Sequence, residues 1–292
     1  KQDKAILEHS FNVDPDGGHI AKVVAINGLD AVKKISATVG KPIRMMAAQR
    51  VSHISEIQAK ISGEIAVEAK YDGERVQIHR NGNEVNLFSR RLEDISYQFP
   101  DIVEYIIKET HSKQFIIEAE IMPFSKDGKH LGFHKLMQRK RKTDIEEYVK
   151  KIPVKLYCFE LIFLNDKSYL KETYPVRVEE LKKLIKGSDH LKLTERIFTN
   201  DVTEIEKFFN SMIDQGYEGL IAKSQGDDSQ YKAGARAWQW IKWKKDYQQD
   251  MVDTFDLVII GAFYGKGKRS GTYGSLLCAT YNEKRDEFES VT

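Results

Sequence analysis

Two long apolar runs in this sequence carry acidic residues near their centres, and this pattern constrains the fold more than any other feature. Residues 115–122 form the first run, which contains Glu118 and Glu120, and residues 154–164 form the second, which contains Glu160. Apolar runs of this length predict central β-strands. Burial of a carboxylate is costly unless it is paired, so the runs predict a core sheet whose acidic side chains have partners or chemical roles.

Two further segments predict strands. Residues 64–70 alternate, with apolar residues at 65, 67 and 69. Residues 76–88 carry apolar pairs on both sides of Asn81-Gly82, and this dipeptide favours a two-residue hairpin turn. These strands add to the core sheet structure.

Three segments predict helices. Residues 24–39 place apolar side chains at helical spacing, and residues 175–186 begin with a proline and are followed by a glycine. Residues 201–215 begin with Asp201 and Glu204 at the spacing of a capping box. Helices and strands follow one another irregularly, which predicts an α+β fold.

The length of 292 residues suggests two compact units. After residue 245 the pattern changes to a strand at 255–263, four nearby glycines, and a second strand at 275–281. This spacing predicts a small antiparallel barrel. The residues 247–292 are too few to close such a barrel, so we expect it to be cut short.

The composition excludes several classes of protein. With 46 basic and 44 acidic residues the net charge is +2, so a nucleic-acid partner must be bound by local patches rather than by bulk charge. The two cysteines lack the spacing of a zinc site, and no apolar run approaches the ~20 residues of a membrane span. The basic patches are residues 135–142, Lys242 with Lys244 and Lys245, and Lys266 with Lys268 and Arg269.

The sharpest local signal for chemistry surrounds Lys70. This lysine ends an apolar strand and is followed by Asp72, Gly73 and Arg75. A glycine turn lets a ligand approach the backbone closely, and an arginine can bind phosphate or ribose. On these residues alone, an ordinary charged turn explains the segment equally well.

Other residues favour an anion site. Trp240, Lys242 and Lys244 share one face of an extended strand, and two amines that point together are costly unless an anion lies between them. Glu218 and Lys223 are five positions apart, so they share a site only if Gly219 bends the strand entry or Glu218 precedes the strand. A polyphosphate would satisfy the two amines.

Six segments occur in the order of the nucleotidyltransferase motifs of ATP-dependent DNA ligases, which the chain resembles from about Lys41 to its end. The resemblance is to the archaeal and eukaryotic replicative type. The segments are KYDGER at 70–75, LFSRR at 87–91, FIIEAE at 115–120, YCFEL at 157–161, EGLIAK at 218–223 and WIKWKK at 240–245.

The resemblance implies an architecture. An adenylation (nucleotidyltransferase) domain of antiparallel sheets flanked by helices would occupy residues 40–246. Residues 1–39 would be the helical C-terminal part of a DNA-binding domain, and residues 247–292 a truncated OB-fold barrel. The family's final basic motif, which orients pyrophosphate, is not found, so we expect a truncated ligase core.

The resemblance also implies a mechanism and a site. Lys70 would attack the α-phosphate of ATP and form a lysyl-AMP; AMP would pass to the 5′-phosphate of a DNA nick, and the 3′-hydroxyl would then seal the strand. Mg²⁺ would be bound by Glu120 and Glu218. The nucleotide-binding residues would be Glu68 and Phe159 at the base, Arg75 and Arg90 at ribose and phosphate, Glu120, and Lys223, Lys242 and Lys244 at the α-phosphate. Glu118 matches no motif, so we expect it to form a structural ion pair.

Nicked double-stranded DNA is the implied partner. The residues expected to contact it are Arg139, Lys140, Arg141, Lys142, Lys266, Lys268 and Arg269. A sliding clamp is a further candidate partner, and a monomer without membrane attachment is expected. An archaeal protein would be cytoplasmic and nucleoid-associated, and a eukaryotic one nuclear.

Alternatives remain open at this point. The KxDGxR segment also suits an RNA ligase or an mRNA-capping guanylyltransferase, although the later segments favour a DNA ligase. A basic nucleic-acid-binding module with a structural Lys70 is a third hypothesis, and Phe159 could be a plain core residue. NAD⁺ as the donor is disfavoured, since the cysteines form no zinc site.

Overall fold

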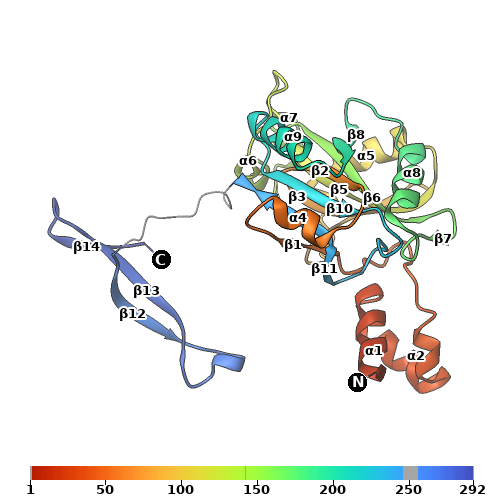
Figure 1. Ribbon diagram of the computed structural model, residues 1–292, viewed down its shortest axis with the longest axis horizontal. Helices are drawn as coiled ribbons and strands as arrows, with labels where there is room; N and C mark the ends of the chain where they lie inside the picture. The colour runs from red at the N-terminus through yellow and green to blue at the C-terminus, as the bar shows by residue number, and fades with distance from the viewer. Residues whose placement is uncertain (1, 142, 246–255, 292) are drawn as a thin grey trace. The chain divides into compact units, whose positions relative to one another are not determined.

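The structure of the chain is a computed structural model that describes residues 2–141, 143–245 and 256–291. Its contacts separate two compact units, residues 1–248 and residues 249–292. Figure 1 shows the elements of each unit. In the described residues, two large β-sheets belong to the first unit and a small sheet belongs to the second.

The first large sheet has six strands. Its order is β4 (Glu84–Ser89), β3 (Glu74–Asn81), β5 (Gln114–Pro123), β6 (Val154–Leu164) and β7 (Lys167–Ser168), with β8 (Leu191–Leu193) paired in parallel to β6. The other pairs are antiparallel. The predictions of central strands at 115–122 and 154–164 are confirmed. So is the hairpin, in which Gly82 adopts a φ of 64° that suits glycine.

The second large sheet has five strands. Its order is β1 (Ala47–Arg50), β11 (Arg236–Lys244), β10 (Gly219–Ser224), β2 (Ile65–Lys70) and β9 (Arg196–Thr199). β1 runs parallel to β11, and the remaining pairs are antiparallel. The strand predicted at 64–70 is confirmed as β2.

Helices cover the outer faces of both sheets. α5 (Pro100–Glu109) and α8 (Tyr174–Leu184) pack on the six-stranded sheet, and α4 (Ser55–Lys60) and α9 (Val202–Asp214) pack on the five-stranded sheet. α6 (Phe133–Met137) and α7 (Ile145–Lys151) lie between β5 and β6 in the chain. A third apolar cluster, which includes Met46, Ile116 and Trp240, joins the inner faces of the two sheets.

The alternation of β5 explains why its sequence is both apolar and acidic. Ile117 and Ala119 pack into the core of the six-stranded sheet and its helices, whereas Ile116 packs on the opposite face. Because residues two apart share a face, Glu118 and Glu120 lie on the side of Ile116. The two acids of the apolar run therefore face the region between the sheets.

The N-terminal segment is helical, but its helices differ from the expected one. α1 (Gln2–Val13), α2 (Gly17–Asn27) and the short α3 (Leu29–Val32) replace the single helix predicted over 24–39. Gly28 adopts a φ of 78°, which ends α2. The backbone N–H of Arg44 donates to the carbonyl of Asn12 at 2.8 Å and ties α1 to the sheets.

The predicted helix at 201–215 is present as α9, with a different cap. The Asp201 carboxylate accepts from the backbone N–H of Thr203 at 2.8 Å. Glu204 does not complete a capping box, because its carboxylate accepts from the Thr199 hydroxyl, and Thr199 Oγ1 instead accepts from the backbone N–H of Asp201 at 3.0 Å. The expected capping box is therefore wrong, although the N-cap is right.

The second unit contains an antiparallel sheet of three strands in the order β12 (Val258–Tyr264), β13 (Tyr273–Asn282) and β14 (Glu287–Ser290). β12 and β13 correspond to the strands predicted at 255–263 and 275–281, and residue 255 lies outside the described residues. Ile259 and Phe263 are each 61% exposed. Both residues lie on β12, so this strand carries large exposed apolar side chains.

The predicted fold class is confirmed, because the sheets are mainly antiparallel and are flanked by helices. The domain boundaries remain predictions, and the one expected at 246/247 lies outside the described residues. Among the helices in the described residues, none is long and apolar enough to cross a membrane.

Candidate active site

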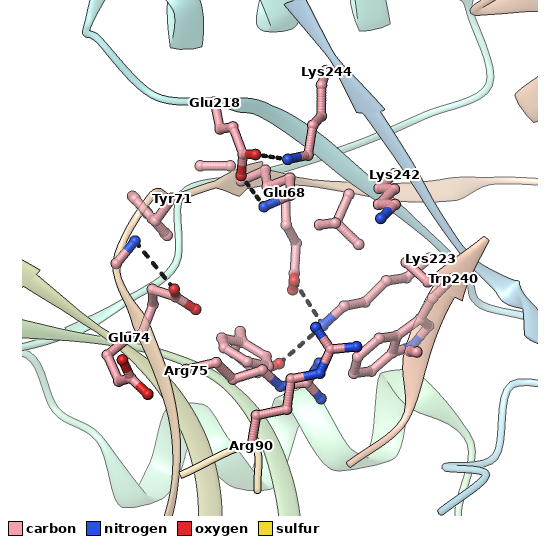
Figure 2. A pocket seen from close by; sticks show the side chains of 18 of the residues that line it. Glu68, Tyr71, Glu74, Arg75, Arg90, Glu218, Lys223, Trp240, Lys242 and Lys244 are labelled. Carbon is pink, nitrogen blue, oxygen red and sulfur yellow. Dashed lines mark hydrogen bonds and ion pairs between the residues drawn. The ribbon is translucent and has the colours of Figure 1, made fainter. Parts of the chain in front are cut away.

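A cavity of about 440 Å³ is lined from both sheets of the first unit. β2, β10 and β11 contribute one side, and β3, β5 and β6 the other. Figure 2 shows the side chains of labelled residues directed into this common space. All ten residues predicted to act on nucleotide or metal line the cavity: Glu68, Lys70, Arg75, Arg90, Glu120, Phe159, Glu218, Lys223, Lys242 and Lys244.

Strand pairing explains why several lysines reach the same cavity. Lys70 pairs with Gly219, which in turn pairs with Lys244. Because residues two apart on a strand share a face, the next row points the same way. That row consists of Glu68, Ile221 and Lys242. The predicted shared face of Trp240, Lys242 and Lys244 is confirmed, since all three line the cavity.

Glu218 connects two of these lysines. Its carboxylate forms ion pairs with the amines of both Lys70 and Lys244 (Figure 2). Glu218 lies just before β10, and Gly219 enters the strand with a φ of 149°. A Cβ at Gly219 would lie 2.2 Å from the carbonyl oxygen of Trp243, so only glycine fits there. Glu218 precedes the strand, so the second of the two alternatives foreseen for Glu218 and Lys223 to share a site is met.

Glu68 is buried and multiply paired. Its Oε2 lies 2.7 Å from Lys223 Nζ, and its Oε1 lies 2.5 Å from Arg196 Nη2. The Tyr174 hydroxyl also donates to Oε1. Burial would raise the pKa of Glu68, but the charges of Lys223 and Arg196 hold it below its usual value. Glu68 is therefore an ionised acceptor at the inner end of the cavity.

Glu120 behaves differently. Its Oε1 accepts from the backbone N–H of Gly73 at 3.2 Å. Burial raises the pKa of Glu120 to about 7, although the nearby charges of Lys70 and Arg75 oppose this rise. The carboxyl group therefore changes charge near neutral pH, and a bound cation would favour its ionised form.

Arg75 and Phe159 lie together on the wall formed by the six-stranded sheet. The Arg75 guanidinium is 5.4 Å from the centre of the Phe159 ring and 5.5 Å from that of Trp240. Arg75 Nη2 also pairs with Glu118 at 2.8 Å. Glu118 is fully buried and accepts from the Tyr231 hydroxyl at 2.8 Å. The expected structural ion pair of Glu118 is confirmed.

The basic side chains at the cavity repel one another. Burial lowers the pKa of Lys242, as do the charges of Lys70, Arg236, Arg90 and Arg50. Arg236, which lines the cavity, was not singled out from the sequence. A bound anion would relieve this repulsion.

One expected DNA contact is wrong. The Arg139 side chain is 1% exposed, and its guanidinium pairs with both carboxylate oxygens of Asp101, at 3.0 and 2.6 Å. It is a core residue. Lys140 is exposed and pairs with Glu74 at 2.8 Å, and the Arg141 guanidinium lies 4.5 Å from the ring centre of Tyr148.

The remaining residues expected to contact DNA lie either outside the described residues or in the second unit. Lys142 lies outside the described residues. Lys266 and Arg269 are exposed in the second unit, and Arg269 Nη1 donates to the carbonyl of Gly274 at 3.0 Å. The backbone of Lys268 belongs to a short 3₁₀ turn, Gly267–Arg269.

The carboxylates can serve a magnesium ion only with help from a ligand. In the described part of the chain, no three His, Cys, Asp or Glu side chains gather in a way that could hold a metal alone. Mg²⁺ is commonly bound through one or two carboxylates together with waters and substrate phosphates. Glu120 and Glu218 both line the cavity, so this donor set fits Mg²⁺ bound with a nucleotide.

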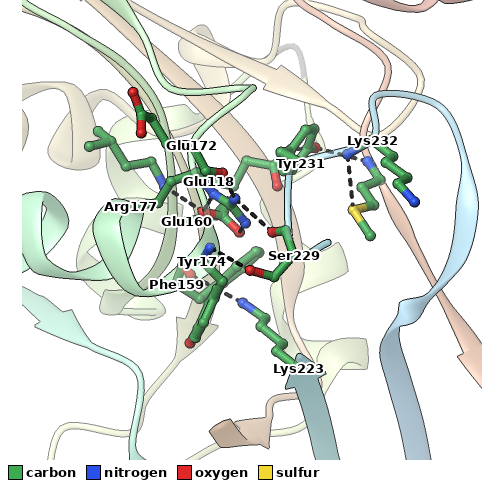
Figure 3. A network of polar contacts seen from close by, with 12 residues as sticks. Glu118, Phe159, Glu160, Glu172, Tyr174, Arg177, Lys223, Ser229, Tyr231 and Lys232 are labelled. Carbon is green, nitrogen blue, oxygen red and sulfur yellow. Dashed lines mark hydrogen bonds and ion pairs between the residues drawn. The ribbon is translucent and has the colours of Figure 1, made fainter. Parts of the chain in front are cut away.

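Sequence reasoning missed several residues that support the site. Arg196 and Tyr174 bind Glu68, and Tyr231 binds Glu118. Arg177 binds Glu160 (Figure 3), through Nε at 2.7 Å and Nη2 at 3.0 Å. The one available signal was the acids in the apolar strands, which require buried cations as partners. That signal does not identify which arginine pairs with which acidic residue.

Comparisons with known families agree with the geometry. The family model described as "ATP dependent DNA ligase domain" matches residues 45–244, which include all ten predicted nucleotide and metal residues. The chain belongs to the ATP-dependent DNA ligases. The family assignment and its archaeal relatives confirm the resemblance seen in the motifs.

Curated DNA ligases are similar along almost the whole chain. A DNA ligase of Sulfophobococcus zilligii is 46% identical over 289 residues, covering 99% of this chain and 48% of the relative. A DNA ligase of Saccharolobus islandicus is 46% identical over 287 residues, covering 98% and 48%. The chain thus spans about half the length of these ligases.

Solved structures share the fold. The structure titled "Pmar-Lig_Pre." has a TM-score of 0.60 at 17% identity and covers 94% of this chain and 59% of that one. The ligase domain of M. tuberculosis LigD has a TM-score of 0.52 at 23% identity, covering 84% and 70%. At these identities the likeness supports the nucleotidyltransferase fold of the ligase.

Proposed function

We propose that this chain is the nick-sealing core of an ATP-dependent DNA ligase. One observation carries the proposal: every residue predicted to act on nucleotide or metal lines a single cavity around Lys70. Seven basic side chains and four acidic ones line that cavity, so it suits a polyanionic ligand. A purely structural lysine would not explain this convergence.

Lys70 is the proposed nucleophile. Its amine must lose a proton before it attacks, and Glu218 lies in contact with Nζ and can accept that proton. A bond then forms between Nζ and the α-phosphorus, and the bond to the leaving oxygen breaks, which releases pyrophosphate. Lys223, Lys242 and Lys244 line the same cavity and would stabilise the charge on the α-phosphate.

The later steps act on DNA. The 5′-phosphate of a nick takes the AMP from Lys70, and the 3′-hydroxyl then displaces AMP and joins the strand. Mg²⁺, when bound by Glu120 and Glu218 with the phosphates, would neutralise phosphate charge. The exposed Lys140, Arg141, Lys266 and Arg269, together with Lys142 and Lys268, are the proposed phosphate contacts on DNA. A sliding-clamp partner and a monomeric state stay predictions from the family resemblance.

Labelling with ATP tests the proposal. Incubation with ATP labelled at the α-phosphate should leave an acid-labile, hydroxylamine-sensitive adduct on the chain, and Lys70→Ala should abolish it. Lys60→Ala is a control, because Lys60 lies outside the cavity, against the Trp238 ring at 4.9 Å. Label that persists on Lys70→Ala would refute the nucleophile. Equal labelling by GTP would favour a capping enzyme, and absence of any adduct a binding module.

A further inference from the structure

The two oxygens of Glu68 are engaged very unequally. Oε1 accepts from Arg196 Nη2 at 2.5 Å, from Arg196 Nε at 3.0 Å, and from the Tyr174 hydroxyl. Oε2 contacts Lys223 Nζ at 2.7 Å. Each carboxylate oxygen has two lone pairs, so Oε1 is saturated and Oε2 has one acceptor position left.

The donors on Oε1 are fixed in place. The backbone N–H of Tyr174 donates to Ser229 Oγ at 2.9 Å, and the carbonyl of Ser229 accepts from Arg177 at 2.9 Å (Figure 3). The Arg196 side chain is only 5% exposed. Glu68 Oε1 therefore cannot turn to a ligand without breaking buried hydrogen bonds, which is costly.

Glu68 lies where the base of a bound nucleotide would reach. It is two residues from Lys70 on the same face of β2, about 7 Å along the strand. Its partner Lys223 donates to the carbonyl of Phe159 at 3.2 Å and lies 5.1 Å from the centre of that ring. The carboxylate and an aromatic ring thus meet at the inner end of the cavity.

We propose that Arg196 and Tyr174 set the base specificity of the site by occupying Oε1 of Glu68. Guanine presents adjacent N1–H and N2–H₂ donors that match both oxygens of a carboxylate, whereas adenine presents one amine, N6–H₂. Because Arg196 and Tyr174 already occupy Oε1, Glu68 offers a ligand one acceptor position, on Oε2. This position satisfies the N6 amine of adenine, but it leaves one of the two guanine donors unpaired. An unpaired polar group of this kind is what rejects a wrong ligand. This inference rests on the proposed function.

The charges around Glu68 support this account. Although burial would raise its pKa, Lys223 and Arg196 keep the pKa of Glu68 below the usual value. The group therefore remains an acceptor at neutral pH and does not become a donor that could bind the O6 atom of guanine.

Nucleotide binding by calorimetry tests the inference on the whole chain. The measured quantity is the ratio of the dissociation constants for GTP and ATP, which we expect to be well above one. Arg196→Met frees one position on Oε1 and should lower the ratio roughly tenfold, the effect of one hydrogen bond to a charged group. Arg196→Lys keeps the cation with fewer donors and should give an intermediate ratio.

Arg80→Met is the matched control. Arg80 is also a buried arginine, but it binds the carbonyls of Ile106 and Thr110 and does not line the cavity. It should lower the melting temperature and leave the ratio unchanged. If Arg196→Met is poorly folded, Arg196→Lys carries the same test.

Each outcome decides the matter. An unchanged ratio in both Arg196 variants, with ATP and GTP weakened equally, would overturn the inference and leave the proposed function standing. Equal binding of ATP and GTP by the unchanged chain would also overturn the inference, and the labelling of Lys70 by each nucleotide would then decide separately between a ligase and a capping enzyme. Failure of the unchanged chain to bind any nucleotide would instead overturn the proposed function, and this inference with it.

Discussion

Glu120 carries a pH dependence that its sequence position alone would not suggest. Burial raises its pKa from 4.5 to about 7, so between these values the folded chain holds a proton that the unfolded chain has lost. Stability contributed by this proton is present below pH 4.5 and is lost as the pH rises to about 7. A Glu120→Gln variant cannot lose that stability.

The difference in stability between the Glu120→Gln variant and the unchanged chain is therefore predicted to depend on pH. Relative to the unchanged chain, Glu120→Gln should gain stability between pH 5 and pH 8, by at most roughly 3 kcal/mol. Urea unfolding at both pH values measures this difference. Glu84→Gln, at the exposed first residue of β4, should show no such change. A constant offset for Glu120→Gln at the two pH values would contradict the raised pKa.

Glu218 is expected to matter more for chemistry than for folding. Glu218→Gln keeps the size of the side chain but removes the charge that pairs with Lys70 and Lys244. Adduct formation on Lys70 should slow by at least tenfold and need more Mg²⁺, while the melting temperature changes by a few degrees at most. The adduct rate is measured across Mg²⁺ concentrations. Parallel losses of rate and stability would indicate a structural role.

At the scale of elements, the turn between β2 and β3 depends on Gly73. A Cβ at this position would lie 2.2 Å from the carbonyl oxygen of Ile121 and 2.8 Å from Met122 Sδ. Gly73→Ala should therefore push β3 from β5 and destabilise the chain by about 1–3 kcal/mol. Gly132→Ala is the matched control, since nothing lies within 4 Å of its Cβ and its φ is −67°. Equal melting temperatures for both variants would contradict the clash.

Most elements near the cavity could be predicted from sequence. The alternation in β2 and the Asn81-Gly82 turn are local signals, and both are confirmed in the structure. The cap at Asp201 was also local and correct. The ordered motifs located the cavity-lining residues, because strands that pair side by side bring sequence-distant motifs together.

The failures have physical causes. A basic run does not reveal which side chain turns inward, and Arg139 does so because Asp101 on α5 offers a bidentate partner. The spacing at 24–39 looked helical, but Gly28 adopts a positive φ that stops the helix. Arg196 lies in a short strand with no motif, and only the register of β9 against Glu68 brings it to the site.

At the scale of the whole molecule, the proposed DNA contacts fall in both units. Each lysine or arginine that contacts a phosphate releases counterions, so the logarithm of the binding constant falls with the logarithm of salt by about 0.9 per contact. Combined replacement of Lys266, Lys268 and Arg269 by Ala should lower this slope for nicked DNA. Labelling of Lys70 by ATP should stay nearly unchanged, because the cluster does not line the cavity.

Titration of a nicked duplex at several salt concentrations measures the slope. Replacement of Lys284 by Ala, at an exposed turn outside both basic patches, is the control and should leave the slope as it was. An unchanged slope in the triple variant would place the cluster among ordinary solvated charges.

Because Glu218 pairs with two lysines, nucleotide binding in the cavity replaces one anion, the Glu218 carboxylate, with another, the phosphate. Its carboxylate already serves as counter-ion to Lys70 and Lys244. An incoming triphosphate must displace it from at least one amine, so one anion replaces another at these lysines. Few mobile ions are then released to solvent on binding. The affinity for nucleotide is consequently expected to vary little with salt, although the affinity for DNA varies steeply.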